Sequence, residues 1–301
     1  MSRSHAIRSG FRSVYSDPAL YLAELSWRWI SGLVGWMFVT YGVLLFLRSL
    51  PVSGFDAFGL SGIIPQLVPR ALEHIFRGSG PAMLRLSLAL AFSLSLLWWI
   101  SSSFGRFATL RALGGGGSIA PVLRLNLLRI WLGSCVWLAY LGAFLLARSL
   151  ATIPGRYGAE FHPGRFYLSF LLLTILIGMA SSTLGWYLTL APVCAVMRRL
   201  NPGAAFVEAV RLAREQGSQF SWVGAVLWLP RMALRVVFFF AFFWALSLIN
   251  ETPAGTGWLL LFFFSAAYSA VNAFLSVVRT ACYVRIVEWE RGLRFVAPRA
   301  A

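Results

Sequence analysis

Residues 167–191 read YLSFLLLTILIGMASSTLGWYLTLA, a run without one charged side chain. The hydrocarbon core of a bilayer is about 30 Å thick, and an α-helix needs about 20 apolar residues to cross it. This run is therefore long enough to span a membrane as a single helix. Five other runs meet the same criterion, so that the predicted spans are 27–47, 81–104, 126–147, 167–191, 231–249 and 257–278.

The composition agrees with a membrane protein. The 301 residues are 59% hydrophobic and only 12% charged, whereas about 25% of residues are charged in an average protein. No segment between the runs is long and polar enough to form a separate soluble domain. The predicted fold class is an all-α integral membrane bundle of six transmembrane helices with short interfacial amphipathic helices, in a single domain over 1–301.

The arginines predict the orientation. All 26 basic residues are Arg, and with ten acidic residues they give a net charge of +16. Cytoplasmic loops of membrane proteins collect positive charge. With the N-terminus inside, seventeen arginines fall on the cytoplasmic side and seven on the other, and Arg231 and Arg235 complete the total. We therefore expect a multi-pass protein of the bacterial inner membrane with both termini cytoplasmic. The same bias accounts for the positive charge, so no nucleic-acid partner is expected.

A charged stretch, 192–220, separates the fourth and fifth spans. Asn201 is a favourable N-cap, Pro202 suits the first helical position, and Gly217 is a natural stop. These signals predict a helix over 202–216, lying along the cytoplasmic interface.

The predicted helix 202–216 has an apolar and a charged side. Phe206, Val210 and Ala213 share one face at i, i+4 and i+7. Glu208 and Arg211, and then Arg211 and Glu215, are spaced for surface ion pairs. Together with Arg214, Glu208 and Arg211 are candidates for contact with lipid or with a partner protein.

Arg231 and Arg235 are the most informative charged residues, since a spacing of four places both on one helix face. If the helix begins near Phe220, they lie well inside the membrane; if Pro230 begins a new helix, they lie at the cytoplasmic boundary, which is the less costly geometry. They could bind an anionic lipid headgroup or a partner's carboxylate. They could equally be anchors that extend toward lipid phosphates.

Small residues mark a candidate packing face on the fourth span. Gly178, Ser182 and Gly185 recur at i, i+4 and i+7 and would permit close helix approach. A substrate path could use the same face. Asn272 in the sixth span is a candidate for a hydrogen bond between helices.

Two loops carry recognisable patterns. Residues 65–78 predict an interfacial helix with Glu73 four residues before Arg77 and with an apolar face formed by Val68, Leu72, Ile75 and Phe76. The GGGGS stretch at 114–118 lacks the Lys-Ser/Thr pair of a phosphate-binding loop and is interpreted as a flexible connector.

Two segments, LAPVCAVMRRLNPGAAFVEAVRLAREQGSQF (190–220) and SVVRTACYVRIVEWERGLR (276–294), carry a family resemblance. Their order resembles the membrane domain attached to some glycerophosphoryl diester phosphodiesterases, in stand-alone form. The matching features are Ala191-Pro192, the Ala-rich start of the following helix, and Tyr283 to Gly292. The resemblance implies a six-helix bundle and no activity, because the catalytic barrel of those enzymes is a separate domain that this chain lacks.

The reactive residues indicate no active site. His5, His74 and His162 lie outside the spans, none of the ten carboxylates falls in the middle of a span, and the three cysteines are far apart. No catalytic residue, metal site or cofactor is expected, and the chain is not expected to be an enzyme.

The leading hypothesis is a non-enzymatic subunit or scaffold of a larger membrane assembly, in contact with anionic lipids and with other membrane subunits. One alternative is a component of a transporter or permease for a lipid-like or amphipathic substrate. Another is an enzyme for lipid headgroups, which would need Glu208, Glu215 or Glu288 to cluster with arginines in a cleft.

Overall fold

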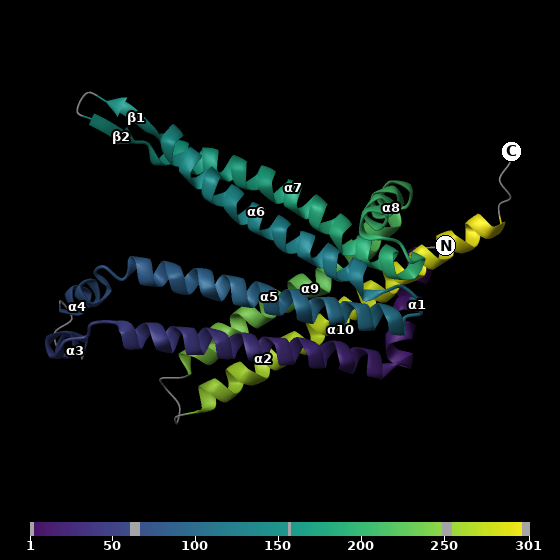
Figure 1. The fold of residues 1–301 in the computed structure, drawn as a ribbon, viewed down its shortest axis with the longest axis horizontal. Helices are drawn as coiled ribbons and strands as arrows, with labels where there is room; N and C mark the ends of the chain where they lie inside the picture. Colours follow the sequence, from purple (N-terminus) through teal and green to yellow (C-terminus); the bar gives the residue numbers. More distant parts are fainter. Residues whose placement is uncertain (1–2, 61–66, 156–157, 249–254, 297–301) are drawn as a thin grey trace. The chain divides into compact units, whose positions relative to one another are not determined.

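The computed structural model describes residues 3–60, 67–155, 158–248 and 255–296 (Figure 1). It is 91% helical, and six of its helices are long and apolar enough to cross a membrane. The predicted all-α membrane fold class is confirmed.

Five of the long helices contain one predicted span each, and α9 contains the fifth span except its last two residues, because the helix ends at Ser247 and residue 249 lies outside the described residues. Even the shortest has 31 residues, a length of about 46 Å at 1.5 Å per residue, which exceeds the hydrocarbon core by several turns. Sequence analysis counted only the apolar part of each helix. The helices are α2 (Pro18–Ser49), α5 (Gly80–Ala112), α6 (Ile119–Ala151), α7 (Pro163–Arg198), α9 (Gly217–Ser247) and α10 (Thr256–Val296).

Shorter elements precede or connect the long helices. Four of them are helices, α1 (Arg3–Ser16), α3 (Gly54–Leu60), α4 (Leu67–Phe76) and α8 (Pro202–Glu215). Strands β1 (Thr152–Gly155) and β2 (Gly158–Phe161) pair antiparallel, with Thr152 opposite Phe161. Sequence analysis missed this ribbon, because a two-stranded ribbon between helices is too short to show an alternating pattern.

The chain divides into two compact units, of which one is Trp27–Ser101 and the other combines Met1–Ser26 with Ser102–Ala301. The Trp27–Ser101 unit is a helical hairpin closed by α3 and α4. Gly42 of α2 lies against Leu86 and Leu90 of α5, where an added Cβ would come within 3.0 Å of the Leu86 side chain. The glycine lets the two helices of this hairpin approach closely.

The α4 helix confirms part of the prediction for 65–78, whose first two residues lie outside the described residues. The ion pair between Arg77 and Glu73 is present at 3.9 Å. The buried residues are Ala71 and Ile75, whereas Leu72 and Phe76 are exposed. Of the predicted apolar face, Ile75 and the half-buried Val68 pack within the protein, while Leu72 and Phe76 stay available to a membrane surface, so the interfacial role stays a prediction.

The larger unit has its hydrophobic core at one end of the long helices, which we call the packed end. In this unit α6 lies along α7 and α9 along α10, and α8 packs on α7 while α1 packs on α10 (Figure 1). The core combines the last turns of α1, α5 and α7, the first turns of α2, α6 and α9, one side of α8, and the C-terminal half of α10. Its largest fully buried members include Val14, Val122, Leu190, Val196, Leu212, Phe220, Leu227, Val278 and Ile286.

Successive long helices contribute alternately a beginning and an end to the packed end. Neighbouring helices along the chain therefore run in opposite directions, as the predicted topology requires. The side of the membrane on which the packed end lies stays a prediction.

The GGGGS turn belongs to the packed end, and the expectation of a flexible connector was wrong. Gly117 donates its N–H to the carbonyl of Val196 at 3.0 Å. A Cβ on Gly117 would lie 2.8 Å from Val196 Cα, and a Cβ on Gly115 would lie 2.8 Å from the Leu110 carbonyl oxygen. The glycines are needed because the backbone of the turn touches the backbone at the end of α7.

This contact predicts a large difference between two glycine substitutions. Gly117→Ala should lower the thermal stability of the detergent-solubilised protein by several degrees, because overpacking of a tight contact costs about 1–3 kcal/mol. Gly203→Ala in α8 is the matched control, since nothing lies within 4 Å of its added Cβ. A thermal unfolding curve for each variant tests the contact, and equal melting temperatures would contradict it.

Candidate functional site

The charged residues of α8 form an ion-pair chain that joins it to α7. Glu208 accepts hydrogen bonds from Arg198, in the last turn of α7, and from Arg211. Arg211 also lies 3.7 Å from Glu215. The predicted Glu208–Arg211–Glu215 pairs are confirmed. Sequence analysis missed Arg198, because ten residues and a change of helix separate it from Glu208.

The two partners in this link between helices are largely withdrawn from the surface. The side chains of Arg198 and Glu208 are only 14% and 15% exposed. Removal of either would leave a poorly solvated charge, so this pair is a structural link between α7 and α8. Arg214 is exposed and lies outside the ion-pair chain.

The predicted apolar face of α8 lies partly in the core, and neighbouring alanines complete its buried side. The buried residues are Ala205, Ala209, Leu212 and Ala213, of which only Ala213 was predicted. Phe206 and Val210 are partly buried. Small alanines face the core because they let α8 approach α7 closely, and a ranking by hydrophobicity alone does not reveal that preference.

The sequence signals predict the beginning of α8 correctly but not its end. The Asn201 side chain accepts a hydrogen bond from the Ala204 N–H at 2.9 Å, which confirms the predicted N-cap. Gly217 does not act as a stop after α8. It begins α9, and Gln216 lies between the two helices.

Arg231 and Arg235 lie in the interior of α9, which continues through Pro230 without a break. Of the two geometries considered, the structure has the helix that begins near Phe220, and Pro230 does not begin a new helix. The pair follows Leu227, the last residue of α9 in the packed-end core, and precedes the exposed apolar segment that begins at Val236. The arginines therefore mark the boundary between the core and the exposed part of this helix. Arg235 is exposed and Arg231 is partly buried.

The small-residue face of α7 is open within the described part of the chain. A Cβ added to Gly178 would find only the Tyr140 hydroxyl, at 3.8 Å, and one added to Gly185 would find nothing within 4 Å. Ser182 is exposed. Among the described residues no helix packs closely against Gly178 or Gly185, so the packing role of this face stays a prediction.

A buried polar cluster at the junction of α5 and α6 was not predicted. Asn126, with no exposed surface, donates through Nδ2 to Ser103 Oγ at 2.9 Å and to Ser102 Oγ at 3.5 Å. Arg106 donates to Asn126 Oδ1 at 3.4 Å. The only sequence signal was an Asn at the first residue of a predicted span, where a polar side chain needs a partner.

Glu24 is a buried carboxylate, only 4% exposed, in the first turns of α2. It lies before the predicted span 27–47, so the expectation of no carboxylate at mid-span is not contradicted. Thr109 of α5 donates to Glu24 Oε2 at 2.7 Å and also to the Gly105 carbonyl at 3.0 Å. Both polar links hold α5 at the packed end, one to α2 and one, through Asn126, to α6.

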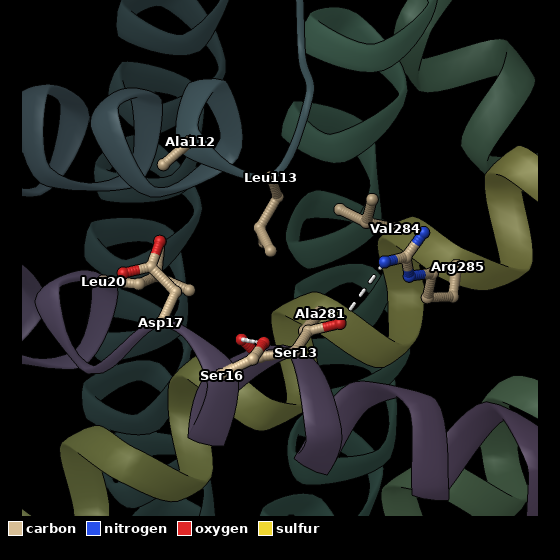
Figure 2. Close-up of a pocket in the computed structure, with 9 residues that line it drawn as sticks. All are labelled: Ser13, Ser16, Asp17, Leu20, Ala112, Leu113, Ala281, Val284 and Arg285. Carbon is tan, nitrogen blue, oxygen red and sulfur yellow. Dashed lines mark hydrogen bonds between the residues drawn. The ribbon is translucent and has the colours of Figure 1, made fainter.

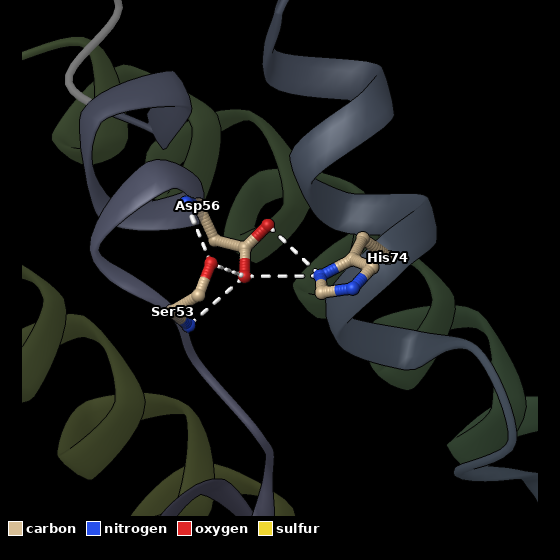
Figure 3. A network of polar contacts seen from close by, with 3 residues as sticks. All are labelled: Ser53, Asp56 and His74. Atoms are coloured by element: carbon tan, nitrogen blue, oxygen red, sulfur yellow. Dashed lines mark hydrogen bonds and ion pairs between the residues drawn. The ribbon is translucent and has the colours of Figure 1, made fainter.

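In the other unit, Ser53, Asp56 and His74 form a network with the composition of a catalytic triad but not its geometry (Figure 3). In a triad the serine hydroxyl bonds the imidazole. Here Ser53 Oγ donates to Asp56 Oδ2 at 2.6 Å, and His74 Nδ1 lies 3.0 Å from the same oxygen. The backbone N–H groups of Ser53 and Asp56 bond each other's side chains, at 2.9 and 3.2 Å. This is a capping box that starts α3, and His74 links it to α4.

Over the described ranges, no group of three or more His, Cys, Asp and Glu side chains is placed to hold a metal ion.

Asp56 is held as a carboxylate, because the hydrogen bonds from the Ser53 side chain and backbone lower its pKa from the ordinary value of 3.8.

The lowered pKa of Asp56 predicts how the α3–α4 contact responds to acid. A carboxylate with a depressed folded-state pKa contributes stability above its unfolded pKa, and this stability is lost as the pH falls through the folded value. Hydrogen-exchange protection of the α4 amides, corrected for intrinsic rates, should therefore be constant from pH 7 to about 4 and fall below that. Asp56→Asn should weaken protection at pH 6 and flatten this acid dependence; an unchanged profile would contradict the role of the carboxylate.

Comparison with known proteins adds no functional assignment. No family model matches the chain, and no match was found among curated proteins or solved structures. The resemblance to the membrane domain of glycerophosphoryl diester phosphodiesterases stays a prediction, and the interpretation of the site rests on its own geometry.

Proposed function

We propose that the protein is a non-enzymatic subunit or scaffold of a larger assembly in the bacterial inner membrane, with both termini cytoplasmic and with lipids among its contacts. The observation that carries the proposal is the concentration of packing at one end of the long helices, which leaves their apolar segments available to neighbours.

The α7 helix illustrates this division. The run from Leu190 to Val196 is buried throughout, whereas no residue between 163 and 187 is buried. In α9 likewise, no residue between 228 and 244 is buried. Extended apolar surfaces of this kind face lipid tails or the helices of other proteins. A bundle that worked alone through an internal site would need its spans to enclose that site.

The open small-residue face supports a protein neighbour in addition to lipid. Apolar side chains gain little by leaving lipid tails, so small and polar residues provide much of the association between membrane helices. Gly178, Ser182 and Gly185 offer such a surface on α7. Asn272 of α10 is partly buried and forms no side-chain hydrogen bond with the described residues, so it could bond a neighbouring helix.

The engaged state of the acidic groups supports the non-enzymatic part of the proposal. Glu208 is bound by two arginines, Asp56 is part of a helix cap, and Glu24 is bonded by Thr109. A general acid or base must reach a substrate proton. These carboxylates instead join elements of the chain to one another.

The first test concerns the α7 face. Gly185→Leu should leave the isolated chain folded, since nothing lies within 4 Å of the added Cβ, and should abolish a contact with a partner helix. Gly133→Leu in α6 is the matched control, because that glycine is equally open but has no small-residue face around it. The measurement is native electrophoresis and cross-linking of mildly solubilised membranes.

We expect the wild type and the Gly133 variant to migrate in a larger complex, and the Gly185 variant to lose it. Migration of the wild type as a lone 33.4 kDa chain without a reproducible cross-link would refute the subunit proposal. If the Gly185→Leu variant keeps the complex, the small-residue face of α7 is not part of the interface.

The second test concerns Arg231 and Arg235. Replacement of both by Gln should reduce the anionic lipid retained in native mass spectra, because each basic residue near the surface attracts anionic lipid by about 1 kcal/mol. The control is Arg48→Gln with Arg148→Gln, which removes two charges at the opposite ends of long helices. This control should retain more anionic lipid than the Arg231/Arg235 variant. Equal retention by both double variants would reduce Arg231 and Arg235 to non-specific anchors.

A further inference from the structure

A cavity of about 210 Å³ opens at the packed end between α1, α2, α5 and α10 (Figure 2). Its polar lining comes from Ser13, Ser16, Asp17 and Arg285, and its apolar lining includes Leu20, Leu113 and Val284. Figure 2 shows Asp17 and Arg285 on opposite sides, with the two serines between them. The cavity therefore has a negative side and a positive side.

The negative side offers hydrogen-bond acceptors. Ser13 Oγ donates its proton to the Ser9 carbonyl at 2.9 Å, and Ser16 Oγ donates to the Ser13 carbonyl at 3.1 Å. A hydroxyl has one proton, so these two oxygens can only accept further bonds. The Asp17 carboxylate forms no hydrogen bond or ion pair with the side chains that the structure describes. This side suits a small cation that carries several N–H donors.

The positive side is a guanidinium with spare donors. Arg285 donates through Nη1 to Glu288 at 3.2 Å and through Nη2 to Ser13 Oγ at 3.4 Å. Arginine has five N–H donors, and the Arg285 side chain is 49% exposed. Planar pairs of N–H groups on a guanidinium suit phosphate oxygens.

We propose that this cavity binds a phosphoethanolamine group, with its ammonium at Asp17 and Ser16 and its phosphate at Arg285. Choline is excluded by the same chemistry, because a quaternary ammonium has no N–H to donate to the acceptors. The volume suits a headgroup and not an acyl chain. The inference deepens the proposed lipid contact and rests on it for the source of the ligand, since phosphoethanolamine can arrive as a phospholipid headgroup or as the free zwitterion.

The test uses the full chain in mixed micelles that contain equal amounts of ethanolamine and choline phospholipid. Native mass spectrometry should show preferential retention of the ethanolamine lipid by the wild type. Asp17→Asn keeps the size of the side chain and removes its charge, and Arg285→Gln removes the cation; each should weaken ethanolamine retention by at least about tenfold, as expected for a hydrogen bond to a charged group. The matched controls are Glu73→Gln on α4 and Arg165→Gln on α7, both exposed.

Added free phosphoethanolamine distinguishes the two sources. If it displaces the lipid at millimolar concentration, the headgroup alone is the ligand; if it does not, the site requires the whole phospholipid. Equal retention of both lipids by the wild type, or equal losses in the cavity and control variants, would overturn the proposal. Where a cavity variant has a lowered melting temperature, Ser16→Ala replaces it, with a smaller loss expected.

Native electrophoresis of the same samples separates this inference from the subunit proposal. If a cavity variant loses its preference for ethanolamine lipid while the complex stays intact, the result supports the cavity assignment and leaves the subunit proposal unaffected. Selective retention by a chain that migrates alone would contradict the subunit proposal and leave the cavity assignment intact.

Discussion

The backbone-to-backbone contact between the GGGGS turn and the end of α7 is the constraint on which the packed end depends. Gly115 and Gly117 leave no room for a side chain between the turn and residues 110 and 195–196. This approach fixes where α5 ends and α6 begins relative to α7. The Arg198–Glu208 pair then attaches α8 to the same end of α7, and the core closes around Leu190, Leu212 and Phe220.

Polar groups at the packed end act as connections between helices. Asn126 joins α5 to α6, Thr109 joins α5 to Glu24 of α2, and Tyr21 of α2 donates to the Ala270 carbonyl of α10 at 3.2 Å. Hydrophobic burial is non-directional, whereas hydrogen bonds have narrow geometry. In a chain with such a large apolar fraction, these bonds specify which helix ends meet. The cavity lined by Ser13, Asp17 and Arg285 differs from these connections, because Asp17 and part of Arg285 are left available to bind a ligand.

The sequence was sufficient for the number and positions of the spans, because a long apolar run has few alternatives to a membrane helix. It was also sufficient for the Asn201 cap and for the ion pairs within α8, which are set by local spacing. The sequence was insufficient wherever the position of a residue depended on its contacts with another helix. The buried alanines of α8 depend on how closely this helix approaches α7, the Glu208–Arg198 pair joins two helices, and the glycines of the turn look the same in a flexible linker and in a tight contact.

The core of the packed end is assembled from residues 14 to 287, nearly the whole length of the chain. Its first contributor, α1, packs on α10, which is synthesised after all the other described elements. The part of the core that α10 supplies is therefore missing until α10 has been made, and until then each earlier membrane helix is satisfied by its own backbone hydrogen bonds. Assembly of this end is complete only after α10 has been made, so a chain truncated before α10 would be helical yet without the core residues from Leu275 to Val287.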